Sequence, residues 1–354
     1  MKKIMVVVMG GTGLVGQQFV RLLDGHPYFE LAAITASGRS AGRSYGQAMP
    51  WAVGGDIPER AARLEVLDTS LETVMSRAPD IVFSALPAAA AEGIEPALRE
   101  RGVRVFSNAG CRRQDADVPV LIPEINPGHL ELARRQQARY GGFIVTNSNC
   151  STSGLALVLK PLEKFGLREV TVTTFQSISG AGRRGLASFD IAGNVIPWIK
   201  NEEEKMERES RKILGELTAD GIRPASFPVS ATCCRVPVRE GHLMSVSVRF
   251  ANGAGAADVA EALAAFRGVP QGLGLPTAPE QPIIVRPEED RPQPALDAWA
   301  GRPERARGMA VSVGRIREKD GVLSLILLVH NTVRGAAGAC VLGAELAAAE
   351  KLAG

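Results

Sequence analysis

The sequence has few cysteines, few aromatic residues, little net charge and no long hydrophobic run. Its five cysteines are scattered over 354 residues and form no CxxC pair. We therefore expect neither a bound metal nor a disulfide framework, and a reducing compartment fits best. Lys and Arg number 41 against 38 Asp and Glu, and 5% of residues are aromatic. This composition does not predict a nucleic-acid-binding surface.

The hydrophobic runs are too short for a membrane protein. The N-terminal run covers only residues 4–9 before glycines interrupt it, which is shorter than a secretory signal requires. The later run at residues 323–329 is far below the roughly 20 residues that cross a bilayer. We expect a soluble cytoplasmic protein, with neither nucleic acid nor membrane as a partner. Its length is typical of two domains.

The first 150 residues alternate between predicted strands and helices. Short apolar runs at residues 4–9, 31–35, 81–85 and 103–106 are typical of buried parallel strands. Helical spacing lies between them, as at residues 16–23 and 89–100. This alternation predicts an α/β domain with a doubly wound parallel sheet.

The pattern changes in the second half of the chain. Residues 170–177, 243–250 and 323–330 alternate as strands of an antiparallel or mixed sheet do when one face is covered. Residues 151–165 and 256–266 are predicted helices on that sheet. Residues 288–307 are rich in proline and charge, which predicts an irregular excursion. An alanine-rich helix is expected over residues 335–352.

A glycine-rich turn follows the first strand. Gly11, Gly13 and Gly16 form GxGxxG, and Gly10, Gly13 and Gly16 form a looser version. Such glycines let the backbone approach a pyrophosphate at a helix N-terminus. Because this turn follows a strand and opens a helix, it predicts a Rossmann-type dinucleotide site rather than a structural turn.

The loop after the second strand indicates which dinucleotide binds. An NAD site usually has an acidic residue there to hold the ribose hydroxyls. This chain has Ser37, Arg39 and Ser40 and no acid. Two hydroxyls and a guanidinium suit a 2′-phosphate, so the sequence favours NADP. The alternative is that Arg39 is a solvated loop residue.

Cys150 lies where a strand ends and a helix begins, in the segment TNSNCST. A helix N-terminus lowers the pKa of a thiol by stabilising the thiolate. Asn149 and nearby backbone N–H groups are candidate oxyanion donors. A lone cysteine is usually a small buried apolar residue, which suits Cys340 and Cys111, but Cys150 has polar neighbours.

Four histidines are candidates for the partner of this thiol. His26 and His129 are expected at the surface, and His330 ends an apolar strand that could face the cofactor. His242 follows Arg235 closely, in RVPVREGH. We expect Cys150 and His242 to be the reacting pair. The alternatives are that Cys150 is a small buried apolar residue and that another histidine is the partner of the thiol.

Ten motifs in order resemble aspartate-semialdehyde dehydrogenases of the archaeal and fungal type. They include GGTGLVGQQF, SNAGCRR, TNSNCST, FQSISGAGRRG, NEEEKMERE, RVPVREGHLMSVSV and HNTVRGAAGAC, and the likeness covers essentially the whole chain. The resemblance implies an N-terminal NADP-binding domain and an α+β catalytic domain with a mixed sheet, similar to glyceraldehyde-3-phosphate dehydrogenase. The boundaries expected are 1–148, completed by a C-terminal helix over 331–354, and 149–330 for catalysis and dimerisation.

The resemblance also implies the reaction. L-4-Aspartyl phosphate reacts with the thiol, phosphate leaves, and NADPH reduces the thioester to L-aspartate 4-semialdehyde, a precursor for lysine, threonine and methionine. Cys150 would form the acyl-enzyme and His242 would be the acid/base, with Gln176 orienting the acyl group. A homodimer or homotetramer is expected, as in the family.

Binding residues are carried over by motif. Arg113 matches a phosphate-binding arginine, although the adjacent Arg112 leaves the register open by one residue. Arg235 would clamp the substrate α-carboxylate. Glu202 and Lys205 would hold the substrate amine and the phosphate, with Asn149 nearby, unless the charged run is simply a solvated helix face. The implied cofactor contacts are Gly11, Thr12, Gly13, Leu14, Val15, Gly16, Ser37, Arg39, Ser40, Leu86, Ser179, Gly180 and Asn331.

Two departures and three alternatives accompany this assignment, and one of the alternatives is an N-acetyl-glutamyl-phosphate reductase. Cys234 stands where the family usually has Asn, and Gly110 stands where it usually has Ser. A malonyl-CoA reductase would share the fold and nucleophile, but its substrate has no α-amine and needs Glu202 and Arg235 less. A silent NADP-binding sensor would need neither the thiol nor its partners.

Overall fold

The computed structural model describes residues 3–353 and divides into two compact units. Unit 1 contains the chain up to Leu121, Pro127–Asn147 and the chain from Ala336 onward. Unit 2 contains Ile122–Asn126 and Ser148–Gly335. No helix within residues 3–353 is long and apolar enough to cross a membrane.

The unit boundaries differ from the expected 1–148, 149–330 and 331–354. Residues 122–126 and 331–335 belong to unit 2 rather than to the cofactor unit. A buried ion pair joins these two segments, because the Glu124 carboxylate accepts from the Arg334 guanidinium at 2.6 Å and 3.0 Å. Arg334 also donates to the Met309 carbonyl of unit 2.

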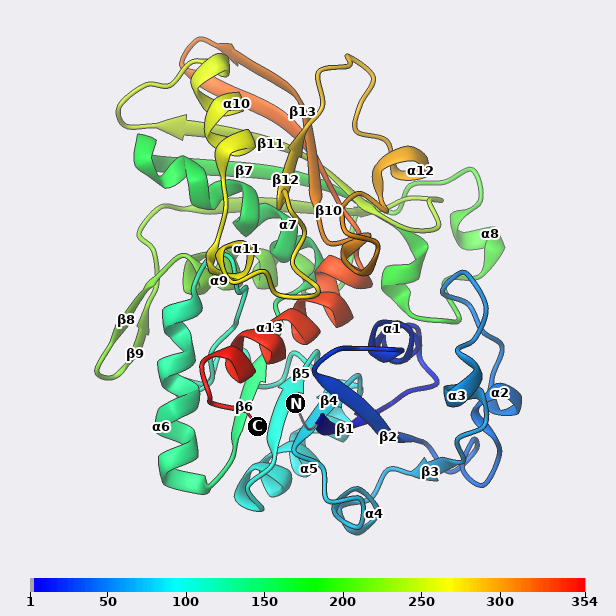
Figure 1. The fold of residues 1–354 in the computed structure, drawn as a ribbon. Helices are drawn as coiled ribbons and strands as arrows, with labels where there is room; N and C mark the ends of the chain where they lie inside the picture. The colour runs from blue at the N-terminus through cyan, green and yellow to red at the C-terminus, as the bar shows by residue number, and fades with distance from the viewer. Residues whose placement is uncertain (1–2, 354) are drawn as a thin grey trace. The chain divides into compact units, whose positions relative to one another are not determined.

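Unit 1 is built on a six-stranded parallel sheet in the order β3-β2-β1-β4-β5-β6 (Figure 1). Every neighbouring pair is parallel, which confirms the doubly wound sheet. Its strands are β1 Ile4–Met9, β2 Phe29–Ala36, β3 Val66–Asp68, β4 Ile81–Ser84, β5 Arg104–Ser107 and β6 Phe143–Thr146. The central strands are continuous apolar runs because both faces of a parallel sheet are covered.

Helices of unit 1 cover that sheet. They are α1 Leu14–Leu23, α2 Tyr45–Ala48, α3 Glu59–Ala62, α4 Leu71–Met75, α5 Ala88–Glu100, a 3₁₀ turn at Pro127–His129, α6 Leu130–Tyr140 and α13 Gly338–Ala349. The C-terminal α13 packs against α1 and β5 (red helix in Figure 1). The buried side chains of His26 and Glu345 bond at 2.9 Å and tie α13 to the chain after α1.

Unit 2 is built on a six-stranded mixed sheet in the order β10-β7-β11-β14-β13-β12. Parallel pairs lie at both edges, and the three central pairs are antiparallel. Its strands are β7 Leu167–Gln176, β10 Val229–Arg235, β11 His242–Phe250, β12 Ile283–Val285, β13 Val311–Lys319 and β14 Val322–Val329. A separate hairpin joins β8 Glu216–Thr218 to β9 Gly221–Arg223.

The longer helices of unit 2 pack against this sheet and each other. α7 contacts β14 and α9, and α9 also contacts β10. The α-helices are α7 Cys150–Leu159, α8 Ser188–Ile191, α9 Glu202–Ile213, α10 Ala256–Ala265, α11 Val269–Gly272 and α12 Pro294–Asp297. Short 3₁₀ turns lie at Lys160–Phe165, Ile178–Ala181 and Glu304–Ala306, and a π-helical turn at Val333–Ala337 leads into α13.

Candidate active site

Four strands of unit 2 bring polar residues to one end of the mixed sheet. Gln176 and Arg235 end the parallel strands β7 and β10 and face each other in register. His242 begins β11 opposite Val329 of β14, so Asn331 follows at the same end. Strand direction therefore gathers residues that are up to 155 positions apart in the chain, from Gln176 to Asn331.

Cys150 is the first residue of α7, as the sequence predicts. The side chain of Asn149 caps this helix, because its Oδ1 accepts the backbone N–H groups of Ser151 at 3.0 Å and Thr152 at 3.2 Å. Its Nδ2 donates to the Glu202 carboxylate at 2.9 Å and 3.0 Å. Asn149 therefore works mainly as a helix cap here, rather than as the free oxyanion donor suggested by the sequence.

The predicted pair lies in contact. Cys150 Sγ and His242 Nε2 are 3.2 Å apart, and the imidazole is fully buried. The backbone N–H of Ser177 donates to His242 Nδ1 at 3.0 Å. A backbone N–H can only donate, so Nδ1 must be an acceptor, and we assign the proton of the neutral imidazole to Nε2. That proton faces the sulfur.

The surroundings keep His242 neutral. Burial lowers its pKa well below 6.5, and the charge of Arg235 and the neighbouring His330 lower it further. A neutral imidazole with its proton on Nε2 donates a hydrogen bond to the sulfur, which favours a thiolate. The geometry thus supports the acid half of the acid/base role expected for His242.

Arg235 is held beside this pair. Its Nη1 donates to the carbonyl oxygen of Ser177 at 2.7 Å, and burial lowers the pKa of the guanidinium from its usual value. Gly180 lies against both groups, because a Cβ there would be 2.6 Å from Arg235 Nη1 and 3.2 Å from His242 Cε1. The absence of a side chain at Gly180 allows this packing.

Asn331 joins the loops around the imidazole. Its Oδ1 accepts from the Gly241 backbone N–H at 3.0 Å and from Ser177 Oγ at 3.2 Å, and its Nδ2 donates to Ser179 Oγ at 2.8 Å. The sequence predicts that Ser179 and Asn331 contact the cofactor. In the structure Asn331 holds the backbone of Gly241, the residue before His242, and bonds to the side chains of Ser177 and Ser179.

Helix α9 has a buried face and an exposed face. Glu202 is buried and pairs with the partly exposed Lys205 at 3.1 Å. Glu209 and Lys212 are buried as well, whereas Glu204 and Arg208 are exposed. The alternative of a solvated charged face is therefore wrong for Glu202, because protein donors take the place of water at its carboxylate.

The two arginines of SNAGCRR, both in unit 1, have different environments. Arg112 donates to the Asp115 carboxylate at 3.0 Å and to the Glu92 carbonyl at 2.8 Å. Arg113 is more deeply buried, and its Nη2 donates to the Asn108 carbonyl at 2.9 Å. Since Arg112 is committed to an acidic partner, the geometry favours Arg113 as the anion-binding residue.

The glycine turn fits a dinucleotide. A Cβ at Gly11 would lie 2.3 Å from Ile34 Cγ2, and a Cβ at Gly16 would lie 2.3 Å from the Gly10 carbonyl oxygen. A Cβ at Gly13, the residue before α1, would lie 3.5 Å from the Gly10 carbonyl oxygen, which is an ordinary contact distance. The turn is therefore tightest at Gly11 and Gly16, and Thr12, Leu14 and Val15 lie beside Gly13 at the N-terminus of α1.

The loop after β2 contains the three residues expected at the 2′-phosphate. Ser37 and Arg39 are exposed, and the Ser40 backbone N–H closes a turn on the Ser37 carbonyl at 2.9 Å. Leu86 follows β4, and its Cδ2 is 3.4 Å from where a Cβ at Gly10 would lie. Leu86 therefore borders the glycine turn within unit 1.

Two family models match this chain. Residues 5–133 match the semialdehyde dehydrogenase NAD binding domain, and residues 159–334 match the semialdehyde dehydrogenase dimerisation domain. The chain belongs to the semialdehyde dehydrogenase family.

Relatives of this semialdehyde dehydrogenase are similar over nearly their whole length. An aspartate-semialdehyde dehydrogenase from Methanothermobacter thermautotrophicus is 48% identical, covering 96% of this chain and 98% of the relative. One from Saccharomyces cerevisiae is 42% identical, covering 98% of each. The crystal structure of the Candida albicans aspartate semialdehyde dehydrogenase with NADP has a TM-score of 0.89 and 39% identity, covering 99% of each chain.

The other three histidines of this semialdehyde dehydrogenase have different surroundings from His242. The expectation that His26 and His129 are surface residues is wrong, because both are buried. His26 bonds to Glu345, and His129 is enclosed where α6 begins. His330 packs edge-on against Trp299 with ring centroids 4.2 Å apart, and its Nε2 lies 3.9 Å from Glu240.

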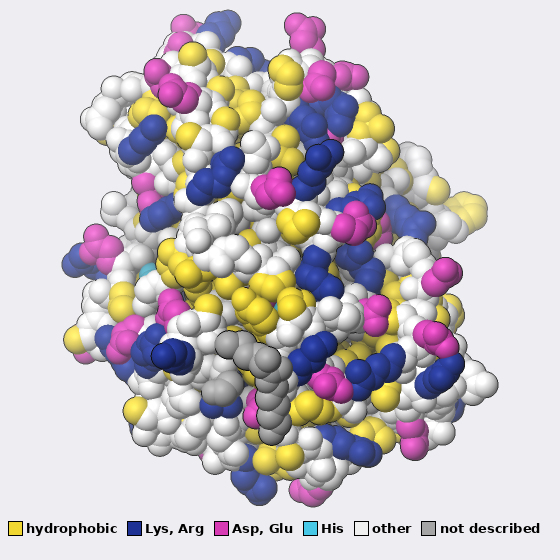
Figure 2. Space-filling view, in the orientation of Figure 1, with side chains coloured by type: hydrophobic (Ala, Val, Ile, Leu, Met, Phe, Trp, Pro, Cys, Tyr) yellow, Lys and Arg dark blue, Asp and Glu magenta, His cyan; other side chains and the backbone are white. Residues whose placement is uncertain are grey.

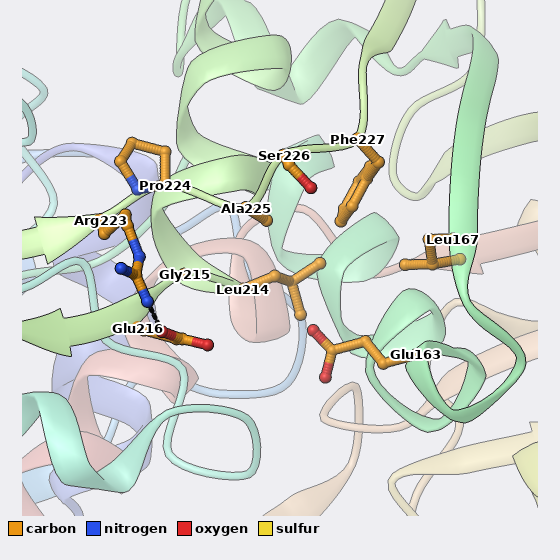
Figure 3. Close-up of a pocket in the computed structure, with 10 residues that line it drawn as sticks. All are labelled: Glu163, Leu167, Leu214, Gly215, Glu216, Arg223, Pro224, Ala225, Ser226 and Phe227. Atoms are coloured by element: carbon orange, nitrogen blue, oxygen red, sulfur yellow. Dashed lines mark hydrogen bonds and ion pairs between the residues drawn. The ribbon is translucent and has the colours of Figure 1, made fainter.

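Unit 2 also has a cavity of about 320 Å³ that contains none of these residues (Figure 3). It lies between the 3₁₀ turn at Lys160–Phe165, the end of α9 and the β8–β9 hairpin, and Glu163, Leu214 and Phe227 line it. The ion pair between Arg223 and Glu216 borders it. On the face drawn in Figure 2, basic and acidic side chains are interspersed.

Sequence reasoning missed three contributors to the site. Ser177 orients His242 through its backbone N–H, which no side-chain pattern reveals. Gly335 lets the π-helical turn approach the nucleophile, because a Cβ there would be 2.8 Å from Cys150 Cβ. Glu209 accepts the backbone N–H of Asn149. Of the three, only Glu209 could have been identified from the sequence, because it lies seven residues after Glu202 and so on the same helix face.

Proposed function

We propose that this protein is an NADP-dependent aspartate-semialdehyde dehydrogenase that converts L-4-aspartyl phosphate to L-aspartate 4-semialdehyde and phosphate. The observation that carries the proposal is the contact of Cys150 Sγ with His242 Nε2 at 3.2 Å, at a helix N-terminus and beside a buried arginine. The family and the relatives support the substrate class.

Cys150 acts as the nucleophile. Its sulfur attacks the acyl carbon of aspartyl phosphate, a C–S bond forms, and the C–O bond to phosphate breaks. The resulting thioester divides one difficult reduction into two easier steps. The N-terminus of α7 and the His242 Nε2–H favour the thiolate form of the sulfur.

His242 supplies a hydrogen-bond donor throughout. The Ser177 N–H holds Nδ1 as an acceptor, so the Nε2–H stays directed at the reacting centre. It stabilises the thiolate first. It then donates to the charge that develops on the acyl oxygen after attack, as a fixed dipole in a buried site does.

The substrate is held by groups of opposite charge. Arg235 would bind the α-carboxylate through its planar fork, and Glu202 would bind the α-ammonium group. Gln176, buried with its Nε2 3.3 Å from Thr174 Oγ1, would orient the acyl group. Lys205 would bind the phosphoryl oxygens, and Arg113 is proposed as a phosphate ligand from its motif alone.

We assign the cofactor contacts from the sequence motifs as well. The glycine turn with Leu86 would hold the pyrophosphate, Ser37, Arg39 and Ser40 the 2′-phosphate, and Ser179, Gly180 and Asn331 the nicotinamide end. When bound, NADPH supplies the hydride that reduces the thioester. The alternative of a malonyl-CoA reductase gains no support, because none of the relatives described above carries that name.

Phosphate dependence tests the proposal. Enzyme, NADP and L-aspartate 4-semialdehyde are mixed with and without inorganic phosphate, and NADPH formation is followed by absorbance. Multiple turnovers that require phosphate are expected, because phosphate must release the thioester. If the aldehyde is not oxidised under either condition while malonyl-CoA consumes NADPH, the substrate assignment is wrong.

We also propose that the protein assembles with itself. The match to a dimerisation domain covers residues 159–334, and within that range Phe189 is 99% exposed and Trp198 is 61% exposed. Apolar side chains exposed to this degree favour a protein partner. Light scattering after size exclusion is expected to give a homodimer or homotetramer, and a monomer at micromolar concentration would contradict the proposal.

A further inference from the structure

Glu209 is a buried acidic residue that the mechanism above does not use. Its side chain is 1% exposed, although it belongs to a strongly charged helix. Its Oε2 accepts the backbone N–H of Asn149 at 2.5 Å. The contact joins the middle of α9 to the residue immediately before the nucleophile.

Asn149 is held by two glutamates of α9. Glu202 and Glu209 are seven residues apart, so they share one helix face and lie about 10.5 Å apart along its axis. Glu202 accepts from the side-chain Nδ2 of Asn149, and Glu209 accepts from its backbone nitrogen. The two bonds have different consequences, because only the second fixes the backbone.

The position of that backbone determines the position of the thiol. Consecutive Cα atoms are about 3.8 Å apart, so a displacement of Asn149 passes directly to Cys150. Gly335 limits movement from another side, since its backbone leaves no room for a Cβ beside Cys150. His242 is held independently by Ser177. The distance of 3.2 Å between sulfur and imidazole therefore depends on the bond to Glu209.

We propose that Glu209 is a positioning residue for Cys150, acting through its hydrogen-bond acceptor rather than through its charge. The proposal deepens the proposed function and rests on Cys150 being the nucleophile. A buried N–H that loses its acceptor moves toward another one, and a displacement of about 1 Å in an active site can reduce the rate about 100-fold.

Two conservative substitutions separate the acceptor from the charge. Glu209→Gln keeps an acceptor oxygen at the same reach and removes the charge. Glu209→Asp keeps the charge and withdraws the acceptor by one methylene. We expect Glu209→Gln to retain most of the wild-type kcat, and Glu209→Asp to lower kcat about 10- to 100-fold with KM for the aldehyde little changed.

The thiol itself provides a second measurement. Alkylation of Cys150 by iodoacetamide, followed by mass spectrometry of its peptide, reports the reactivity of the sulfur without substrate or cofactor. We expect the rate to fall in Glu209→Asp in parallel with kcat, and to stay near wild type in Glu209→Gln. The reverse order of the two variants in both assays would show that charge matters and would overturn the proposal.

Glu207→Leu is the matched control. Glu207 lies on the same helix and accepts a backbone N–H in the same way, from Ala231 at 3.2 Å, but Ala231 is on β10 and does not adjoin the nucleophile. This variant is expected to lose some thermal stability and to keep kcat. A kcat loss equal to that of Glu209→Asp would make the effect one of general stability and would refute positioning.

Cys150→Ser distinguishes failure of this inference from failure of the proposed function. If Cys150→Ser keeps turnover, the nucleophile is assigned wrongly and the inference falls with it. If Cys150→Ser is inactive and Glu209→Asp has wild-type kcat and alkylation rate, the nucleophile stands and only the role of Glu209 is wrong.

Discussion

Removing one partner of the buried Arg334–Glu124 ion pair is expected to destabilise unit 2 strongly. Both side chains are fully buried, and two bonds of 2.6 Å and 3.0 Å join them. Arg334 Nε also donates to the Met309 carbonyl at 2.6 Å. In Arg334→Met, the Glu124 carboxylate stays buried and loses the guanidinium that neutralises it.

The loss in free energy of unfolding follows from the burial of the pair. Breaking a buried pair by removing one partner costs about 3–5 kcal/mol, because an uncompensated charge remains. Replacing both partners by apolar residues of similar volume is often close to neutral. For a domain of about 150–250 residues, the single change lowers Tm by roughly 6–20 °C. The double variant Glu124→Leu/Arg334→Met should recover most of that loss.

Activity should fall with stability in the single variant. The Arg334 carbonyl accepts Ser153 Oγ of α7 at 3.0 Å, and Gly335 packs on Cys150. Urea and thermal unfolding of the wild type, both single variants and the double variant form a double-mutant cycle. Arg307→Met is the control, because its pair with Glu304 is exposed and should contribute at most about 1 kcal/mol. A decrease of less than about 1 kcal/mol in the free energy of unfolding of Arg334→Met would refute the reasoning.

Three further predictions concern the active site and the cofactor. Since the pKa of His242 is well below 6.5 in the folded state, the unfolded state binds more protons below pH 6.5, and the free energy of unfolding should fall as the pH drops from there. The urea midpoint should fall less with pH in His242→Gln than in the wild type, and an equal fall would contradict the lowered pKa. Gly180→Ala should raise KM for the aldehyde by displacing Arg235, and should lower the free energy of unfolding by about 1–3 kcal/mol because the buried site is overpacked; an unchanged KM would count against the clamp. Arg39→Ala should raise KM for NADP more than KM for NAD, and steady-state kinetics with equal losses for both would argue against a 2′-phosphate contact.

The central strands could be predicted from the sequence, and the edge strands could not. β1 and β4 are nearly continuous apolar runs because both faces of their sheet are covered, and β14 is apolar apart from Ser324. β3 and β12 have three residues each at sheet edges, and β10 is an edge strand in which Val229 is followed by small and polar residues. Edge strands need fewer buried side chains, so their hydrophobic pattern is weak.

The reacting pair could be predicted, but much of what holds it in place could not. Cys150 and His242 stand out because few residue types do their chemistry, and the structure places them in contact. Ser177 acts through a backbone N–H and Gly335 through the absence of a side chain. Glu209 is one of several similar glutamates in α9, and only the fold reveals which of them meets the nucleophile.

The direct test of the proposed chemistry is to capture the acyl-enzyme. Enzyme, NADP and L-aspartate 4-semialdehyde are mixed without phosphate, quenched in acid and analysed by mass spectrometry for the peptide that contains Cys150. We expect an aspartyl adduct on Cys150, one NADPH formed for each adduct, and release of the adduct when phosphate is added before the quench. Formation of NADPH with no adduct on Cys150, or undiminished formation in Cys150→Ser, would contradict a thioester mechanism at this residue.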